Sequence, residues 1–262
     1  MAGCNGVFGF LLRKTFYDFW DNFLKIVLVN VGFIALFAVL LFLPELFSSY
    51  VARTAIRILA AGGCLVYLCA AAMSLKSLSD YESFYFADVF RNLKQAAPAG
   101  LFMGLLLFAV SALALAAFSF YAGMDSMLGL VFAVLVFWFV AAALLSLQFF
   151  FAIRARLDAK PFKVLKKCIL IFFDNPGMAF FVLLNGIAML LFSVPLGFLL
   201  PGPAGVLLFV DQALRLRLLK YDWLEANPGA DRRKIPWDAL LAEEREKTGK
   251  RTLKNLIFPW RD

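Results

Sequence analysis

Long apolar runs dominate this chain. A helix that crosses the hydrocarbon core of a bilayer, about 30 Å thick, needs about 20 mostly apolar residues. Six stretches approach that length with almost no charge, and they cover 26–43, 58–75, 99–121, 127–153, 178–194 and 196–210. The last is interrupted by Pro201, Gly202 and Pro203, so we expect its helix to be broken or shallow. The pattern predicts an all-α polytopic membrane protein with six transmembrane helices.

The composition supports the same class. Of the 262 residues, 63% are hydrophobic and 17% are charged, against about 25% charged in an average soluble domain. A water-soluble fold of this composition would expose an unusually large apolar surface. Soluble enzymes, disordered chains and disulfide scaffolds are therefore excluded.

The distribution of Lys and Arg predicts the orientation. With six spans, all but Arg53 and Arg57 of the 26 basic residues would fall on one side of the membrane. Basic residues near spans stay in the cytoplasm, so we expect both termini there. The net charge of +8 then indicates contact with anionic lipid headgroups rather than with nucleic acid.

Three segments that precede odd-numbered spans combine an apolar and a polar helical face. They cover roughly 14–25, 81–95 and 160–172, and we expect them to form cytoplasmic amphipathic helices at the headgroup level. The third is strongly basic, which predicts contact with anionic lipids through four side chains: Lys160, Lys163, Lys166 and Lys167.

The junctions at 19–22, 90–92 and 172–175 resemble one another, since each joins an aromatic residue to Asn through Asp or Arg. Two explanations are open. The chain contains three repeats of an interfacial helix plus a hairpin, or these residues simply suit a helix boundary at the membrane surface.

The sequence changes character after the membrane domain, which we place at 1–223. Residues 224–262 form a charged cytoplasmic tail in which the pattern predicts a short helix near 236–247. Bulky apolar residues return at Ile257, Phe258 and Trp260. A solvated tail does not need them, so we expect them to dock on the membrane surface, on the protein's own cytoplasmic face, or on a protein partner.

Several short motifs resemble bacterial YesL-like integral membrane proteins over about 16–219. They are Asn22, the FRN junction at 90–92, FFFAIRARLD at 149–158, KVLKKC at 163–168 and the Asn-Pro pair at 175–176. The resemblance implies a multi-pass protein of the bacterial inner membrane, associated in some members with carbohydrate uptake systems.

The sequence contains few of the residue combinations that catalytic sites require. The chain has no histidine, which excludes Ser/His/Asp triads, Cys/His pairs and His-ligated metal sites. Its Gly-rich stretches lie in apolar runs without the lysine of a phosphate-binding loop. We therefore expect no enzymatic activity and no cofactor.

The remaining candidates are few. Gly100 and Gly104 have the spacing of a helix-packing seam. Asn30, Gln148 and Asn185 are the side-chain amides inside the expected spans, and they would either bond to neighbouring helices or line a polar path.

Two functions follow from these candidates. The first is a non-enzymatic accessory or scaffold subunit that associates with another membrane complex, such as a solute uptake system. The alternative is a small-solute transporter with a path lined by the three amides.

Overall fold

The computed structural model describes residues 2–124, 126–231 and 235–248, and helices make up most of these ranges. In chain order the helices are α1 (Ala2–Asp21), α2 (Phe23–Phe42), α3 (Tyr50–Ser79), α4 (Phe86–Ala122), α5 (Met127–Leu147), α6 (Phe150–Arg156), α7 (Pro161–Asp174), α8 (Pro176–Ser193), α9 (Gly202–Ala226), α10 (Trp237–Leu240) and α11 (Ala242–Thr248). Short 3-10 turns, η1 (Leu43–Leu46) and η2 (Val194–Leu196), follow α2 and α8.

Five segments of the described chain are long and apolar enough to cross a membrane. They are Phe23–Leu46, Tyr50–Ser79, Phe86–Ala122, Met127–Arg156 and Pro176–Leu196. Each contains one of the first five expected spans, and the all-helical membrane architecture is confirmed at this level. The fourth segment bends at Gln148 and Phe149, where α5 gives way to α6.

The sixth expected span, 196–210, is not among these five. Residues 196–201 lie outside any α-helix, and α9 begins only at Gly202, at the break that the sequence indicates. Helix α9 then packs against α1, α2, α3, α6 and α8. Helix α9 is therefore largely buried among other helices and carries charged residues, so it differs from the five apolar segments.

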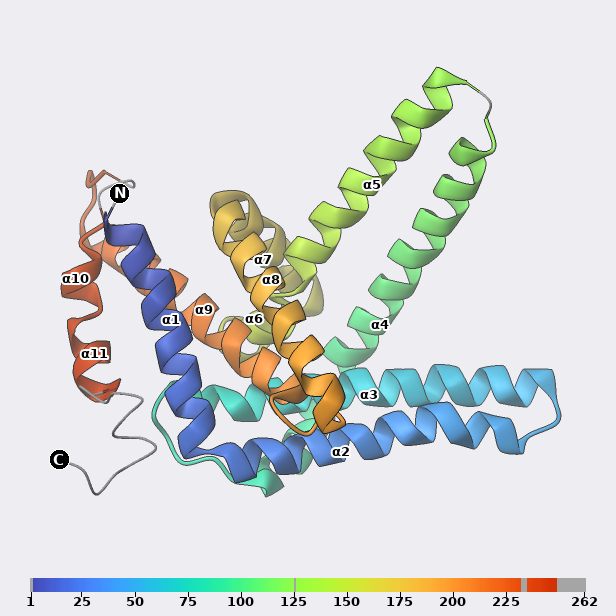
Figure 1. The fold of residues 1–262 in the computed structure, drawn as a ribbon, viewed down its shortest axis with the longest axis horizontal. Helices are drawn as coiled ribbons and strands as arrows, with labels where there is room; N and C mark the ends of the chain where they lie inside the picture. Colours follow the sequence, from blue (N-terminus) through green and yellow to red (C-terminus); the bar gives the residue numbers. More distant parts are fainter. Residues whose placement is uncertain (1, 125, 232–234, 249–262) are drawn as a thin grey trace.

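Helices α8 and α9 nevertheless form an antiparallel hairpin. At one end the Gly202 amide donates to the Ser193 hydroxyl over 2.8 Å, and at the other end Tyr221 bonds to Asp174, two residues before α8 begins. Two longer hairpins, α2–α3 and α4–α5, leave the body in different directions (Figure 1). Helix α9 thus returns the chain to the side from which α8 started.

The first two hairpins are joined where α3 packs on α4. A Cβ atom at Gly100 would lie 2.6 Å from the Val66 Cα atom, and one at Gly104 would lie 3.1 Å from the Leu65 side chain. Because only hydrogen fits at Gly100, the two backbones approach closely there. Both glycines therefore lie on the face of α4 that meets α3.

Two of the three expected amphipathic helices differ from the sequence prediction. The charged face of α1 points inward, since the Lys14 side chain is only 2% exposed while Phe16 and Trp20 are exposed. The second segment is not a separate helix, because α4 continues unbroken from Phe86 to Ala122. Its FRN sequence at 90–92 is thus no helix boundary, whereas Asn22 and Asn175 do separate α1 from α2 and α7 from α8.

The third segment is a separate helix, α7, but its faces divide differently. The pattern predicts an apolar face of Phe162, Leu165, Ile169 and Phe172, but only Phe172 of these is buried, while Phe162 and Ile169 are exposed. The other buried residues of α7 are Val164, Cys168 and Ile171. Helix α7 therefore has an inner apolar face, an outer apolar stripe and lysines beside that stripe.

Part of the tail folds back onto the membrane domain. Helix α9 continues to Ala226, past the expected boundary at 223, and the short helix expected near 236–247 is divided into α10 and α11. Leu241, between them, is fully buried in the core, and α10 lies beside α1 (Figure 1). Residues 235–248 of the tail therefore belong to the folded body.

Replacing Gly100 by Ala tests the close approach of α3 and α4. The new methyl group would meet the Val66 backbone, which cannot rotate away, so we expect the free energy of unfolding in mixed micelles to fall by about 1–3 kcal/mol. Gly63→Ala is the matched control on α3, because a Cβ atom there has no neighbour within 4 Å. It should be neutral or stabilise by up to about 1 kcal/mol. Equal effects at both positions would contradict this packing.

Candidate functional site

The strongest concentration of polar chemistry is a buried group of five side chains from four segments, named here the charge cluster: Asp80, Arg156, Asp211, Arg215 and Glu244. Arg156 holds Asp211 with two parallel hydrogen bonds, of 2.7 Å from Nε and 2.6 Å from Nη2, and donates from Nη1 to Asp80 over 2.9 Å. Arg215 in turn bonds to Asp80 over 2.5 Å and to Glu244 over 2.6 Å. The result is one continuous chain of alternating charges.

The charge cluster links segments that lie far apart in the sequence. Asp80 follows α3, Arg156 ends α6, Asp211 and Arg215 lie on α9, and Glu244 lies on α11. Asp211 is 1% exposed and Glu244 is 5% exposed. Removing one member would leave an opposite charge buried without full compensation, which costs several kcal/mol.

A second polar group joins α1 to the same region. Lys14 pairs with Asp18 over 2.9 Å and lies 3.8 Å from the centre of the Tyr81 ring. Asp18 also accepts from Gln212 of α9 over 2.6 Å, and Gln212 contacts the Thr15 hydroxyl over 2.5 Å. Tyr81 donates to Glu244 over 3.1 Å, so this group adjoins the charge cluster.

Burial shifts the ionisation of the pair on α1. It lowers the pKa of Lys14, and the attraction of Asp18 only partly offsets it. Burial also raises the pKa of Asp18 despite the nearby ammonium group. Both shifts have the same cause, the low polarity around α1, which disfavours each charged form.

The spacing of Asp211 and Arg215 on one helix predicts a simple i,i+4 ion pair, and this prediction is wrong. In the structure the two side chains bind different partners, Arg156 for Asp211 and Asp80 with Glu244 for Arg215. Partners from other segments are within reach because Asp211 is buried and Arg215 is largely covered where α9 meets α3 and α6.

Asn30 fixes the start of α9. Its amide nitrogen donates to the carbonyls of Leu199 and Pro201, each over 2.9 Å, and its oxygen accepts from the Ala204 amide over 2.9 Å. The Asn30 side chain therefore pairs one of the amides that a helix start leaves unpaired, and it also holds two carbonyls of the segment just before α9. A side chain at Gly202 would collide with it, and the positive φ of 60° also favours glycine there.

The other two amides lie elsewhere. Gln148 donates to the carbonyls of Leu145, over 2.8 Å, and Ala179, over 2.9 Å, which ties the α5–α6 bend to α8. Asn185 donates over 2.8 Å to Phe181 in its own helix. Each of the three amides is thus hydrogen-bonded to backbone carbonyls of its own set of partners.

The basic residues of α7 lie along its exposed side. Lys163 and Lys166 are exposed, while Lys167 lies 3.6 Å from Asp158. The backbone amide of Lys160, just before α7, donates to Asp158 over 3.1 Å, and this bond holds the pKa of that carboxyl below its usual range. The expected docking residues Ile257, Phe258 and Trp260 lie outside the described residues.

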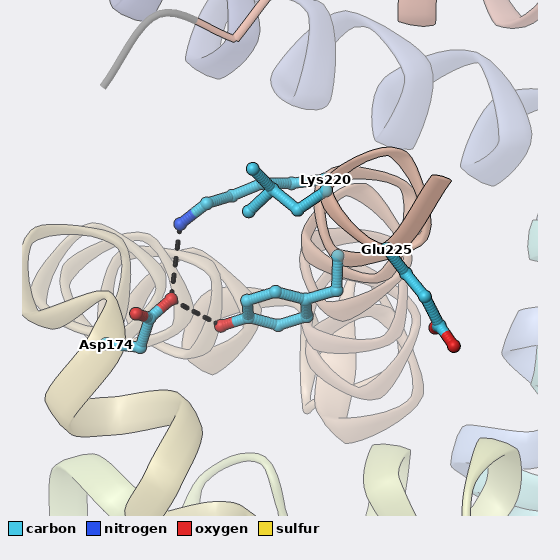
Figure 2. A pocket seen from close by; sticks show the side chains of 5 residues that line it. Asp174, Lys220 and Glu225 are labelled. Atoms are coloured by element: carbon cyan, nitrogen blue, oxygen red, sulfur yellow. Dashed lines mark hydrogen bonds and ion pairs between the residues drawn. The ribbon is translucent and has the colours of Figure 1, made fainter. Parts of the chain in front are cut away.

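A cavity of about 300 Å³ lies beside the C-terminal end of α9. Its lining residues are Asp174, Lys220, Tyr221, Leu224 and Glu225. Figure 2 shows Lys220 of α9 pointing toward the Asp174 carboxylate, to which it donates over 3.2 Å. The Tyr221 hydroxyl donates to the same carboxylate oxygen over 2.7 Å. Partial burial opposes ionisation of Asp174, but these hydrogen bonds outweigh it and lower the pKa of the carboxyl.

Chemically, the charge cluster is suited to cross-linking helices. Its cations and carboxylates are engaged with one another across four segments. Among the described residues there is no group of three or more His, Cys, Asp and Glu side chains that could hold a metal ion.

Sequence reasoning missed most of the charge cluster, although a signal was present. Asp80, Arg156 and Asp211 each lie within five residues after the end of an expected even-numbered span. Since even-numbered spans of a hairpin protein all end on one side, their terminal charges are brought to one level. Glu244 carries no such signal, because its position depends on how the tail folds back.

Removing a carboxylate from the charge cluster should cost far more than removing an exposed one. For Asp211→Ala we expect a loss of about 3–5 kcal/mol in the free energy of unfolding, since Arg156 would lose its bidentate partner. The control is Glu45→Ala, which breaks the exposed pair with Arg57 and should cost less than about 1 kcal/mol. Denaturant titration in mixed micelles measures both, and similar losses would refute the structural role of the charge cluster.

The amides also make a matched pair. Asn30→Leu removes three hydrogen bonds and should cost about 1–3 kcal/mol for each buried backbone group left unpaired. Asn185→Leu removes one bond within a helix and should cost about 0.6 kcal/mol. The comparison uses thermal unfolding in detergent, and a larger effect at Asn185 would contradict the roles assigned here.

Comparison with models of known protein families, with characterised proteins and with solved structures found no match for this chain.

Proposed function

We propose that this protein is a non-enzymatic accessory or scaffold subunit of the bacterial inner membrane, with both termini in the cytoplasm. In this proposal it associates laterally with another membrane complex, and the resemblance to YesL-like proteins favours a solute uptake system as that complex. The proposal is carried by one observation, the exposed apolar surface of the α4–α5 hairpin.

Among the five candidate spans of the described chain, the two in the α4–α5 hairpin are the least covered. Only 6% of the most apolar 18-residue window of α4 is buried, and 11% of the corresponding window of the α5 segment, against 44% for α3. Large aromatic side chains are exposed along both helices, including Phe108, Phe120, Trp138 and Phe139. Aromatic residues are enriched where membrane and soluble proteins meet a partner.

The rest of the molecule suits a rigid base for such a hairpin. The charge cluster and the Asn30 contacts fix α9 among its neighbours, and α3 packs closely on α4 through Gly100. A scaffold needs this combination, because a preorganised surface loses less conformational entropy on association.

The tail provides a second contact in this proposal. Leu241 and Glu244 anchor the α10–α11 segment to the body, and the following residues lead to Ile257, Phe258 and Trp260. The side-by-side position of α1 and α10 agrees with a shared cytoplasmic location for both ends of the chain.

The transporter alternative lacks a supporting observation. It needs Asn30, Gln148 and Asn185 to line one path, and each of the three side chains is hydrogen-bonded to backbone carbonyls, Asn30 just before α9 and the other two on α8.

Site-specific photocrosslinking tests the lateral contact. A photoreactive residue at Phe108 or Phe139 should form an adduct with one partner protein in native membranes, because both side chains point outward from the hairpin. The matched control is Leu59, which is 75% exposed on α3 in the other hairpin, and it should yield lipid adducts alone. Mass spectrometry identifies the adducts. If none of the three positions forms an adduct with another protein, the proposal is overturned.

Deleting 253–262 tests the tail separately. We expect recovery of the same partner after gentle extraction to fall at least about fivefold, corresponding to a loss of about 1 kcal/mol of binding free energy. Unchanged recovery would show that the hairpin alone makes the contact.

A further inference from the structure

A second cavity, of about 400 Å³, adjoins the one in Figure 2 and shares Asp174 and Tyr221 with it. Its lining residues are Leu157, Lys167, Leu170, Ile171, Asp174, Leu218 and Tyr221. We name the two together the α7–α9 cavity. Their volumes are in the range of small-ligand sites, about 300–1,000 Å³.

The lining residues follow from helix geometry. Lys167, Leu170, Ile171 and Asp174 are spaced i, i+3, i+4 and i+7 on one face of α7, while Leu218 and Tyr221 are one turn apart on α9. The cavity thus has an apolar middle between a cationic end at Lys167 and an anionic end at Asp174. Seven residues of helix separate these ends by about 10 Å.

The α7–α9 cavity lies at the boundary of the expected bilayer. Asp174 is two residues before Pro176, where a membrane-spanning segment begins. On the outer side of α7, Phe162 is 76% exposed and Phe173 is 72% exposed, so this helix presents a bare apolar stripe beside its lysines. Such a helix lies at the headgroup level, which places the cavity within reach of lipid molecules.

The charged groups of the cavity have unused bonding capacity. Asp174 receives its bonds from Lys220, Tyr221 and Asn175 on Oδ2, which leaves Oδ1 as an acceptor. At 3.6 Å from Asp158, Lys167 forms only a loose ion pair, and its side chain is 37% exposed. A ligand that carries both a cation and an anion could satisfy the two groups together.

We propose that the α7–α9 cavity binds one glycerophospholipid with a primary-amine headgroup, such as phosphatidylethanolamine. The ammonium group donates to Asp174, the phosphate accepts from Lys167, and part of an acyl chain lies against Leu170 and Leu218. An anionic headgroup fits less well, because the two lysines of the cavity are balanced by Asp174 and Glu225 and Lys220 is already engaged. This inference does not depend on the proposed protein partner.

The test measures which lipid stays with the protein. Full-length protein is reconstituted in nanodiscs with equal parts of phosphatidylethanolamine, phosphatidylcholine and phosphatidylglycerol, extracted in mild detergent, and its retained lipid is quantified by mass spectrometry. We expect about one phosphatidylethanolamine per chain, at least fivefold above phosphatidylcholine, whose quaternary amine cannot donate a hydrogen bond.

Three variants locate the site. Asp174→Asn and Lys167→Gln should each lower retention of phosphatidylethanolamine at least fivefold, whereas Lys163→Gln, one turn away on α7 and outside the cavity lining, should retain it like the unmodified protein. Since Asp174 also holds Lys220 and Tyr221, Lys167→Gln repeats the test without touching that contact. Retention of no specific lipid, preferential retention of phosphatidylglycerol, or equal retention by Lys167→Gln and Lys163→Gln would each overturn the proposal.

Discussion

The buried guanidinium group of Arg156 imposes the constraint on which the other contacts depend. An arginine taken out of water needs compensating charge and partners for its donors, and here Asp211 and Asp80 supply both. Because Asp80 follows α3 and Asp211 lies on α9, satisfying this one residue fixes three segments together. Arg215 in turn bonds to both Asp80 and Glu244, so the network of opposite charges continues to α11.

This constraint explains why α9 differs from the other long helices. It must carry Asp211, Gln212 and Arg215 to their partners on α1, on α6 and after α3, so it is unsuited to contact lipid along its length. Its start is fixed by backbone bonds to Asn30 and Ser193, which are also buried. The far ends of the long hairpins extend away from this centre (Figure 1), and their apolar faces remain available to lipid or to a partner.

The hydrophobic pattern predicted the helical class and the first five spans, because the length of an apolar run is a local property. Which face of an amphipathic helix points inward is not a local property, and α1 shows why. Its pattern separates Lys14 and Asp18 from Phe16 and Trp20, but only the tertiary partners Tyr81 and Gln212 decide that the charged face points inward. The α7–α9 cavity likewise forms between two helices that α8 separates in the chain. The local sequence around Asp174 and Tyr221 therefore gives no indication that the two residues are in contact.

The central claim is that one continuous network of charges holds α3, α6, α9 and the tail together. Hydrogen–deuterium exchange of Arg215→Gln against the unmodified protein tests it most directly, because Arg215 joins Asp80 to Glu244. The account predicts faster exchange in α11 and in the segment around Asp80 at the same time, with the far ends of both long hairpins unchanged. Faster exchange confined to α9 around position 215 would contradict it.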